Sequence, residues 1–178
     1  AELHDLDWLV QHVFTGEDVA ITNVTDDYGV LLVTGPKSRD VLAGLTTADL
    51  TNEGGFTWMC AREIDVVGIR VRALRVSYVG ELGWELHCSM GELRPLYDAL
   101  IASGESYSIR NFGTYALNSL RMEKGYKAWG SELTTEISLI EADMRRFMRK
   151  EGGYIGAEVV QKKKKDGVSL HLVYCQVE

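Results

Sequence analysis

Two β-rich runs near the middle of the chain are joined by only four residues, and this short connection constrains the fold more than any other feature of the sequence. The runs occupy residues 69–79 and 84–88, and the sequence GELG lies between them at residues 80–83. A short, glycine-containing connection between such runs is typical of a β-hairpin. The hairpin predicts that Tyr78 pairs with Glu85, which places an aromatic ring opposite a carboxylate in the sheet.

Helical and extended patterns are mixed along the rest of the chain. Residues 28–34 are apolar at odd and even positions alike, which predicts a strand covered on both faces. Pro36 follows at a position that favours a helix start, and the apolar spacing predicts a helix through Leu45. Further strands are predicted at residues 19–24, 56–64 and 169–177, and further helices at residues 5–13, 91–103, 112–124 and 155–165. Hairpins mixed with strand–helix units indicate the α+β class, with mixed or antiparallel sheets and packed helices.

The charge balance argues against a nucleic-acid partner. The sequence has 19 Lys and Arg against 26 Asp and Glu, a net charge of −7, although four lysines adjoin at residues 162–165. An acidic surface repels a phosphate backbone, and we expect the four lysines to close a helix, because cations are favoured at a helix C-terminus. The apolar runs are a handful of residues, whereas a membrane span needs about 20, so no membrane partner is expected either.

Cysteine and histidine spacing indicates neither a disulfide framework nor a metal site. Cys60, Cys88 and Cys175 are odd in number and far apart, which fits a reducing compartment. The four histidines have no HxxxH or CxxC partner, so the pattern gives a zinc or iron centre no support.

The hairpin is the first candidate for a binding site. Glu85 could accept two parallel hydrogen bonds from a flat N–H/NH2 edge while the Tyr78 ring packs on the face of the same ligand. The alternative is a glutamate that points to solvent and a tyrosine that fills the core.

A second candidate site follows the hairpin in the sequence. In the helix over residues 112–124, Glu123 shares the apolar face and would need a partner there, whereas Arg121 points elsewhere. Tyr126 and Trp129 could line a pocket for a planar ligand or pack in the core. The residues alone therefore predict an α+β domain that binds a planar, hydrogen-bonding ligand.

Three motifs, in order, resemble one enzyme family. They are YVGELGWEL at residues 78–86, NFGTYALNSLRMEKGYKAWG at residues 111–130 and YIGAE at residues 154–158. Together they are similar to the folate-binding aminomethyltransferase module shared by the glycine-cleavage T-protein and the dimethylglycine and sarcosine dehydrogenases. Leu117 stands where the T-proteins have an arginine, and the dehydrogenase-like members also have an apolar residue there. The resemblance is therefore strongest to the dimethylglycine dehydrogenase branch.

The resemblance implies a tetrahydrofolate site and a one-carbon reaction. In the family, the glutamate that ends the YxGExGxE motif holds the pterin ring, and its counterpart here is Glu85. The tyrosine that opens the motif corresponds to Tyr78, and a further pocket tyrosine corresponds to Tyr126. Members of the family transfer a one-carbon unit from an iminium derived from an N-methyl amine to tetrahydrofolate, which gives 5,10-methylenetetrahydrofolate. The aspartate that assists this transfer has no counterpart in the sequence, so no catalytic residue is assigned.

The resemblance also implies a partial module of a larger enzyme. Residues 1–151 correspond to the central part of the folate-binding domain, and residues 152–178 to a linker helix and the first strand of a C-terminal β-barrel. FAD is expected only on an upstream flavin domain of the same protein, which would be a partner alongside folate and a small N-methyl amine. The implied location is the bacterial cytoplasm or the mitochondrial matrix.

Three functional interpretations stay open. The first is the folate-binding part of a dehydrogenase or aminomethyltransferase, which we expect to be inactive as an isolated chain. The second is a regulatory module that kept the fold without the chemistry. The third is a structural fragment that cannot bind folate alone.

Overall fold

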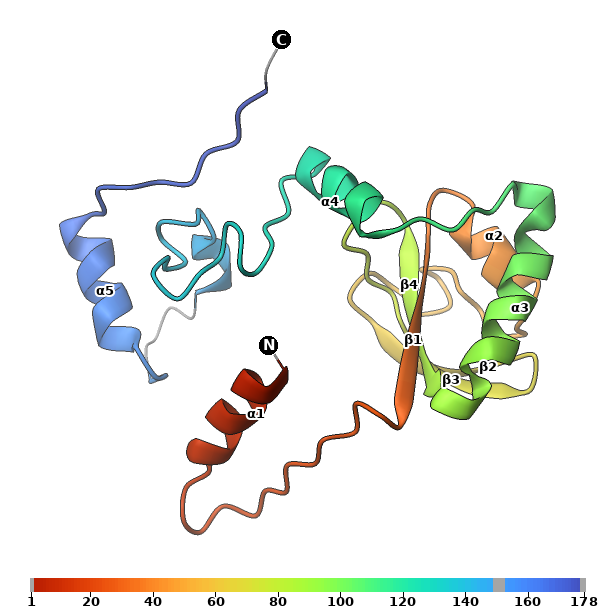
Figure 1. The fold of residues 1–178 in the computed structure, drawn as a ribbon, viewed down its shortest axis with the longest axis horizontal. Helices are drawn as coiled ribbons and strands as arrows, with labels where there is room; N and C mark the ends of the chain where they lie inside the picture. The colour runs from red at the N-terminus through yellow and green to blue at the C-terminus, as the bar shows by residue number, and fades with distance from the viewer. Residues whose placement is uncertain (1, 149–152, 177–178) are drawn as a thin grey trace. The chain divides into compact units, whose positions relative to one another are not determined.

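The computed structural model describes residues 2–148 and 153–176 and contains two compact units (Figure 1). The first unit comprises residues 1–77 and 81–111, and the second comprises residues 78–80 and 112–178. The domain boundary predicted at residue 151 lies among the residues that the structure does not describe, so it stays a prediction.

The first unit is built on a four-stranded antiparallel sheet. Its strands are β1 (Tyr28–Thr34), β2 (Ala61–Val66), β3 (Ile69–Leu74) and β4 (Gly83–Ser89), in the spatial order β1-β4-β3-β2. Every neighbouring pair of strands is antiparallel. The helical segments of this unit are α1 (Glu2–Gln11), α2 (Ser38–Ala43), α3 (Leu93–Gly104) and the short turns η1 (Met90–Glu92) and η2 (Glu105–Tyr107). A sheet with packed helices confirms the predicted α+β class.

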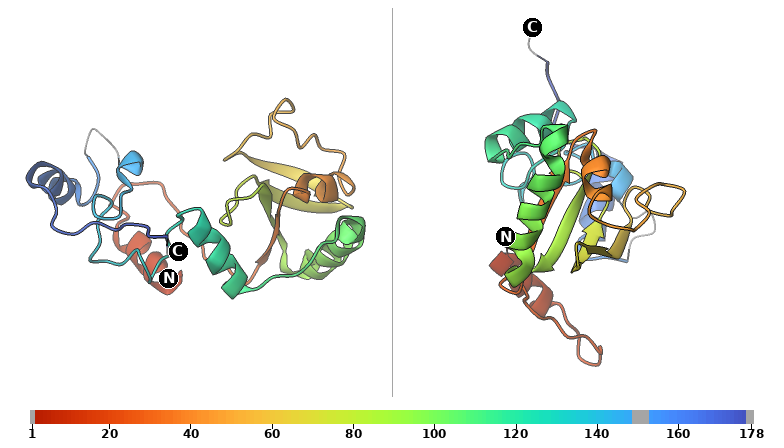
Figure 2. Two further views of the ribbon diagram at one scale, coloured as in Figure 1. Left: turned by 90° about the horizontal axis from the view of Figure 1, so that it is seen from above. Right: turned by 90° about the vertical axis from the view of Figure 1, so that its right-hand side faces the viewer.

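Two helices, α2 and α3, cover one face of this sheet, and the core lies between them and the strands (Figure 2). Along β4, Trp84, Leu86 and Cys88 point into the core. Leu42 of α2 and Leu96 of α3 meet them there and are fully buried. Burying an aliphatic side chain of this size stabilises the fold by about 1.5–3 kcal/mol, so each of these leucines contributes substantially to the stability of the unit.

β1 is buried on one face only, so the prediction of a strand covered on both faces is wrong. Gly29 and Val33 are buried, whereas Val30 and Leu32 are exposed on the opposite face. The physical reason is that α2 and α3 pack on the same side of the sheet. In the part of this unit that the structure describes, no helix packs on the other side.

A tight turn joins β2 to β3, as the sequence predicts around Gly68. Val67 and Gly68 have φ values of 49° and 84°, so both residues lie in the left-handed region. A two-residue hairpin of type I′ requires this conformation at both central positions. The turn fixes the register in which Val66 pairs with Ile69.

The hairpin predicted between residues 69–79 and 84–88 is wrong in register. β3 ends at Leu74, which pairs with Glu85, so Tyr78 does not pair with Glu85. After Leu74 the chain turns toward an earlier segment, and the Arg75 amide donates a hydrogen bond to the Cys60 carbonyl at 2.9 Å. This bond continues the pairing of β3 with the β2 side beyond Leu74, whereas pairing with β4 ends at Leu74, so a longer connection replaces the four-residue loop.

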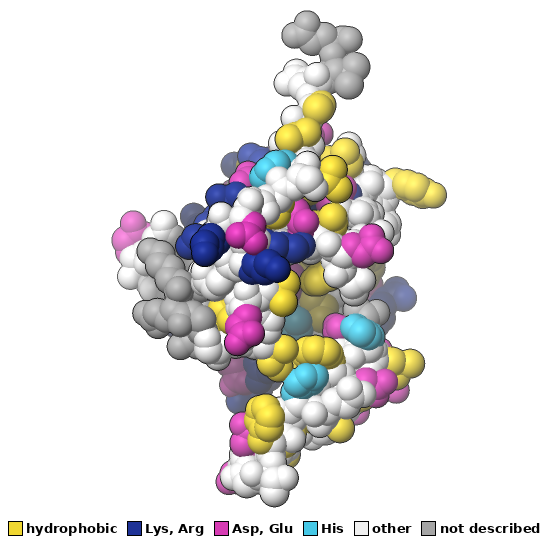
Figure 3. Space-filling model, turned by 90° about the vertical axis from the view of Figure 1, so that its left-hand side faces the viewer, with side chains coloured by type: hydrophobic (Ala, Val, Ile, Leu, Met, Phe, Trp, Pro, Cys, Tyr) yellow, Lys and Arg dark blue, Asp and Glu magenta, His cyan; other side chains and the backbone are white. Residues whose placement is uncertain are grey.

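The second unit contains the helices α4 (Thr114–Glu123) and α5 (Ala157–Asp166) and the turn η3 (Arg145–Phe147). Lysines occupy the last turn of α5, which confirms the prediction for residues 162–165. Figure 3 shows Lys and Arg side chains lying among Asp and Glu side chains on the face it displays. Residues 169–176 form no strand, contrary to the prediction, and residue 177 lies outside the described residues.

The strand predicted at residues 19–24 is also wrong, because these residues are extended without strand pairing. Val19 and Val24 are both exposed, so β-branched side chains alone do not place a segment in a sheet. Within residues 2–148 and 153–176, no helix is both long and apolar enough to cross a membrane.

Glu141 connects distant segments of the second unit. Its carboxylate accepts hydrogen bonds from Lys163 Nζ on α5 at 2.8 Å and from the Ser138 amide at 2.7 Å. Its carbonyl accepts a hydrogen bond from the Leu172 amide at 2.8 Å. The bond from Lys163, followed by that from Ser138, lowers the pKa of Glu141 to about 2.

Leucines on the two faces of the sheet should differ in their contribution to stability. Leu86→Ala empties a fully buried position, so we expect the free energy of unfolding to fall by about 2–5 kcal/mol. Leu32→Ala is the matched control, because Leu32 lies on the neighbouring strand with 44% of its surface exposed, and should cost less than about 1 kcal/mol. Urea unfolding of both variants gives the comparison, and equal losses would contradict one-sided burial.

Acid should destabilise the second unit through Glu141. Because the folded-state pKa is depressed, the stabilisation is fully present above the ordinary value of 4.5 and is lost as pH falls toward about 2. Glu141→Gln removes this titration, so its melting temperature should depend less on pH than that of the wild type in this range. Circular dichroism melts at a series of pH values provide the measurement, with exposed Glu136→Gln as the control. Parallel pH curves for Glu141→Gln and the wild type would contradict the assignment.

Candidate functional site

Glu85 lies in the middle of β4, on the sheet face opposite the core. Side chains alternate along the strand, so Trp84 and Leu86 point into the core while Glu85 and His87 point the other way. The Glu85 side chain is 31% exposed, so its carboxylate is accessible but only partly solvated.

The cross-strand neighbours of Glu85 are apolar. Glu85 pairs with Leu32 on β1 and with Leu74 on β3, and Leu74 pairs in turn with Ala61 on β2. We call these four residues the Glu85 row. Cross-strand Cβ atoms lie about 5 Å apart, so two leucines border the carboxylate. A flat N–H/NH2 edge that bonds to both oxygens would therefore lie against aliphatic surface while making charge-assisted hydrogen bonds.

The next row on the same face is largely charged. His87 pairs with Val30 on β1 and with Arg72 on β3, and Arg72 pairs with Glu63 on β2. The Arg72 guanidinium lies 3.5 Å from the Glu63 carboxylate. His87 Nε2 lies 3.4 Å from Glu85 Oε2, so the imidazole joins this charged row to the Glu85 carboxylate.

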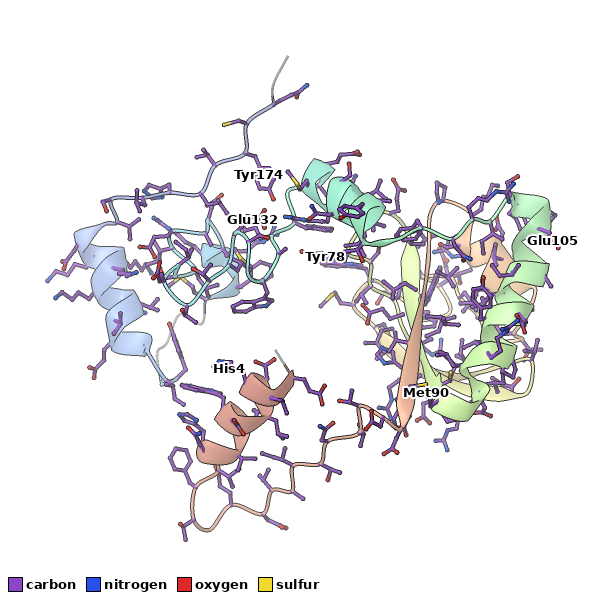
Figure 4. The ribbon with its side chains drawn as sticks, viewed as in Figure 1. His4, Tyr78, Met90, Glu105, Glu132 and Tyr174 are labelled. Atoms are coloured by element: carbon purple, nitrogen blue, oxygen red, sulfur yellow. The ribbon has the colours of Figure 1, made fainter. Side chains whose placement is uncertain are left out.

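Tyr78 and Tyr126 meet in the second unit, and Figure 4 shows Tyr78 near α4. Their rings are stacked, with centroids 5.9 Å apart and an interplanar angle of 16°. The Tyr78 hydroxyl donates a hydrogen bond to the Lys127 carbonyl at 2.6 Å, and burial raises the pKa of Tyr78. Because the two rings already contact each other, a planar ligand can stack only on the outer face of either ring.

Arg121 holds the segment that carries Tyr126. Its side chain is only 3% exposed, and its guanidinium donates hydrogen bonds to Asn118 Oδ1, the Tyr126 carbonyl and Glu132 Oε2, each at 2.8 Å. The same Glu132 oxygen accepts a hydrogen bond from the Ala128 amide at 2.8 Å. The segment over residues 126–132, which follows α4, is therefore held by hydrogen bonds to one buried cation and to its partner Glu132.

Glu132 is the counter-ion of this cation. Burial alone would raise the pKa of Glu132, but hydrogen bonds from the Ala128 amide and from Arg121 outweigh that effect and hold the pKa below its usual value. The Tyr174 hydroxyl adds a hydrogen bond to the Tyr126 carbonyl at 3.1 Å. Tyr126 is thus fixed through its backbone, which leaves its ring free to pack.

The sequence-based prediction for α4 is wrong about which charge is buried. Glu123 is exposed and Arg121 is the buried residue of the helix. The pattern fails because it assumes that the apolar side chains mark the buried face, whereas Phe112 and Ala116 of that face are exposed. Trp129 is also 80% exposed, so it does not pack in a core.

The structure brings together some of the predicted site residues and adds others. Tyr78 and Tyr126 belong to the second unit and contact each other, whereas Glu85 belongs to the first unit. The sequence reasoning missed His87 and the partner of Arg121. The sequence does contain a signal for His87, because residues i and i+2 of a strand share a face and His87 follows Glu85 by two residues.

Metal binding finds no support in the described part of the chain. No group of three or more His, Cys, Asp or Glu side chains there is arranged to hold a metal ion. The structure therefore offers two separate candidates, a carboxylate on an open sheet face of the first unit and a tyrosine pair in the second unit.

Comparison with known proteins identifies the family. The family model described as the GCVT N-terminal domain matches residues 1–152. The chain is 42% identical over 176 residues to the mitochondrial dimethylglycine dehydrogenase of Homo sapiens and 34% identical over 171 residues to the aminomethyltransferase of Bacillus velezensis. The chain therefore belongs to the GCVT N-terminal domain family, which confirms the aminomethyltransferase resemblance of its motifs.

The relatives are longer than this chain. The match to the human dehydrogenase covers 97% of the chain but 20% of the relative, and the match to the aminomethyltransferase covers 95% and 46%. A solved structure, the heterotetrameric sarcosine oxidase from Corynebacterium sp. U-96 in complex with pyrrole 2-carboxylate, is 22% identical with a TM-score of 0.50. The match covers 61% of this chain and 53% of the oxidase chain, and it shows a similarity of fold alone.

Removing Arg121 should loosen the second unit. Arg121→Met leaves Glu132 partly buried without its counter-ion, so we expect a loss of about 2–4 kcal/mol in the free energy of unfolding. Arg94→Met is the control, because its pair with Asp98 is exposed and should contribute about 0.5 kcal/mol or less. Urea unfolding measures both, and equal effects would contradict the structural role of Arg121.

Proposed function

We propose that this chain binds tetrahydrofolate within a dimethylglycine dehydrogenase-like enzyme, with Glu85 as the acceptor for the pterin edge. The observation that carries the proposal is the Glu85 row, in which one partly exposed carboxylate lies between Leu32 and Leu74 on an open sheet face. The N–H/NH2 edge of a pterin matches a carboxylate that can accept two parallel hydrogen bonds. The family membership of the chain supports the choice of a folate over other ligands with such an edge.

The contribution of Glu85 would be orientation. Two hydrogen bonds to one carboxylate fix both the position and the plane of a bound ring, because the donors and acceptors must align in pairs. The bordering leucines would exclude water from one side of that contact, which strengthens the hydrogen bonds. In this account the protein positions the folate and performs no nucleophilic attack itself.

Tyr126 and Tyr78 would supply aromatic surface. The Tyr78 hydroxyl already donates to the Lys127 carbonyl, so Tyr78 offers its ring rather than its hydroxyl. The buried Arg121 keeps Tyr126 in place through its carbonyl. These residues fit a planar ligand as packing surfaces, which is the role that the family resemblance gives to their counterparts.

The proposed reaction is the capture of a one-carbon unit. Tetrahydrofolate, when bound, would accept this unit from an iminium derived from an N-methyl amine and become 5,10-methylenetetrahydrofolate. The amine substrate and a flavin domain carrying FAD are the partners that we propose, and the bacterial cytoplasm or the mitochondrial matrix is the proposed location. The mitochondrial dehydrogenases among the relatives support the latter.

The test compares two glutamates of the same motif. Glu85→Gln replaces one acceptor oxygen with a donor and removes the charge, so we expect folate binding to weaken by about 10–100-fold. Exposed Glu81→Gln, four residues earlier, is the matched control and should bind as the wild type does. Calorimetry with 5-formyltetrahydrofolate on the natural full-length protein gives the affinities.

Two results of this experiment would contradict the proposal. Unchanged affinity in Glu85→Gln would remove Glu85 from the site. A well-folded wild-type protein without folate affinity would favour the alternative of a regulatory module that kept the fold without the chemistry.

A further inference from the structure

We propose that His87 is a positioning residue for the Glu85 carboxylate and makes folate binding dependent on pH. The inference rests on the proposed function, because it concerns the same carboxylate. It goes further by assigning a role to a residue that the motif resemblance leaves without one.

The geometry places the two side chains in direct contact. His87 follows Glu85 by two residues on β4, so both side chains project from the same face of the sheet. His87 Nε2 lies 3.4 Å from Glu85 Oε2, and the two side chains are 29% and 31% exposed. The imidazole is therefore within reach of one carboxylate oxygen.

The charged groups near His87 lie on the neighbouring strands β2, β3 and β4. Arg72 on β3 is its cross-strand partner, and Glu63 on β2 lies 3.5 Å from that guanidinium and offsets its charge. The partner on β1 is the apolar Val30. One row further along the same face, Arg70 on β3 forms an ion pair with Glu63 and pairs with Asp65 on β2, and Tyr28 lies on β1. Glu85 is the remaining charged group that His87 contacts, and it carries the opposite charge to a protonated imidazole.

The protonation state of His87 would decide how much of the carboxylate a ligand can use. A histidine side chain changes charge between about pH 5 and pH 8. A neutral imidazole donates one hydrogen bond to the carboxylate and holds it in place, whereas an imidazolium adds the attraction of opposite charges and so competes more strongly with the N–H donors of the ligand. Folate binding should therefore tighten as pH rises through this range.

The experiment measures the affinity of 5-formyltetrahydrofolate for the natural full-length protein from about pH 5 to pH 8. We expect the wild-type affinity to rise about fivefold, because the attraction between a partly exposed imidazolium and the carboxylate is lost with the proton. His87→Gln keeps a neutral donor and should bind with high affinity at every pH, with no such rise. His12→Gln, which alters an exposed histidine of α1, is the matched control and should keep the wild-type pH profile.

A second variant separates positioning from titration. His87→Leu lacks both the charge and the donor, so its affinity should be independent of pH and lower than that of His87→Gln. Circular dichroism confirms that each variant is folded before its affinity is interpreted.

The outcomes distinguish this inference from the proposed function. If the wild type binds folate and His87→Gln keeps the same pH profile, the role of His87 is overturned while the proposed function stands. If the wild type binds no folate at any pH, the proposed function fails and this inference fails with it.

Discussion

The strict alternation of β4 between buried and outward side chains is the constraint on which the candidate site depends. Trp84, Leu86 and Cys88 lie in the core under α2 and α3, and their burial fixes the register of the strand. A shift by one residue would bury Glu85 and expose the three apolar side chains, which would remove their contribution to the core and place an ionised carboxylate in it. The packing that stabilises the first unit is therefore also what presents Glu85 on the open face.

A buried ion pair has the corresponding role in the second unit. Arg121 and Glu132 hold the segment after α4 through hydrogen bonds to backbone groups as well as to each other. A guanidinium is suited to this task, because it presents several donors in a fixed plane. Arg121 thus organises the tyrosine pair indirectly, through the Tyr126 backbone. Loss of either partner would leave the other charge buried without a counter-ion, so a substitution at Arg121 or Glu132 should destabilise the segment that carries Tyr126.

The sequence predicted the elements better than their pairing. Apolar spacing was sufficient to predict α3, and the terminal run of lysines was sufficient to place the end of α5, because both signals report local physics. The pairing of Leu74 rather than Tyr78 with Glu85 is a matter of register between strands, and contacts between distant segments that set a register leave no local pattern. The burial of Arg121 was likewise unpredictable, because its partner Glu132 lies in an irregular segment. Glu85 was recognised as a candidate because a motif marks it, whereas the leucines that border it became apparent only in the sheet.

The central claim is that the Glu85 carboxylate, on the open face of the sheet, receives the edge of a pterin. A crystal structure of the natural full-length protein with 5-formyltetrahydrofolate tests this claim most directly. We expect the N–H/NH2 edge of the pterin to bond to both Glu85 oxygens, with the ring lying near Leu32 and Leu74. A folate bound with its pterin away from Glu85, and the carboxylate left in contact with solvent, would contradict it.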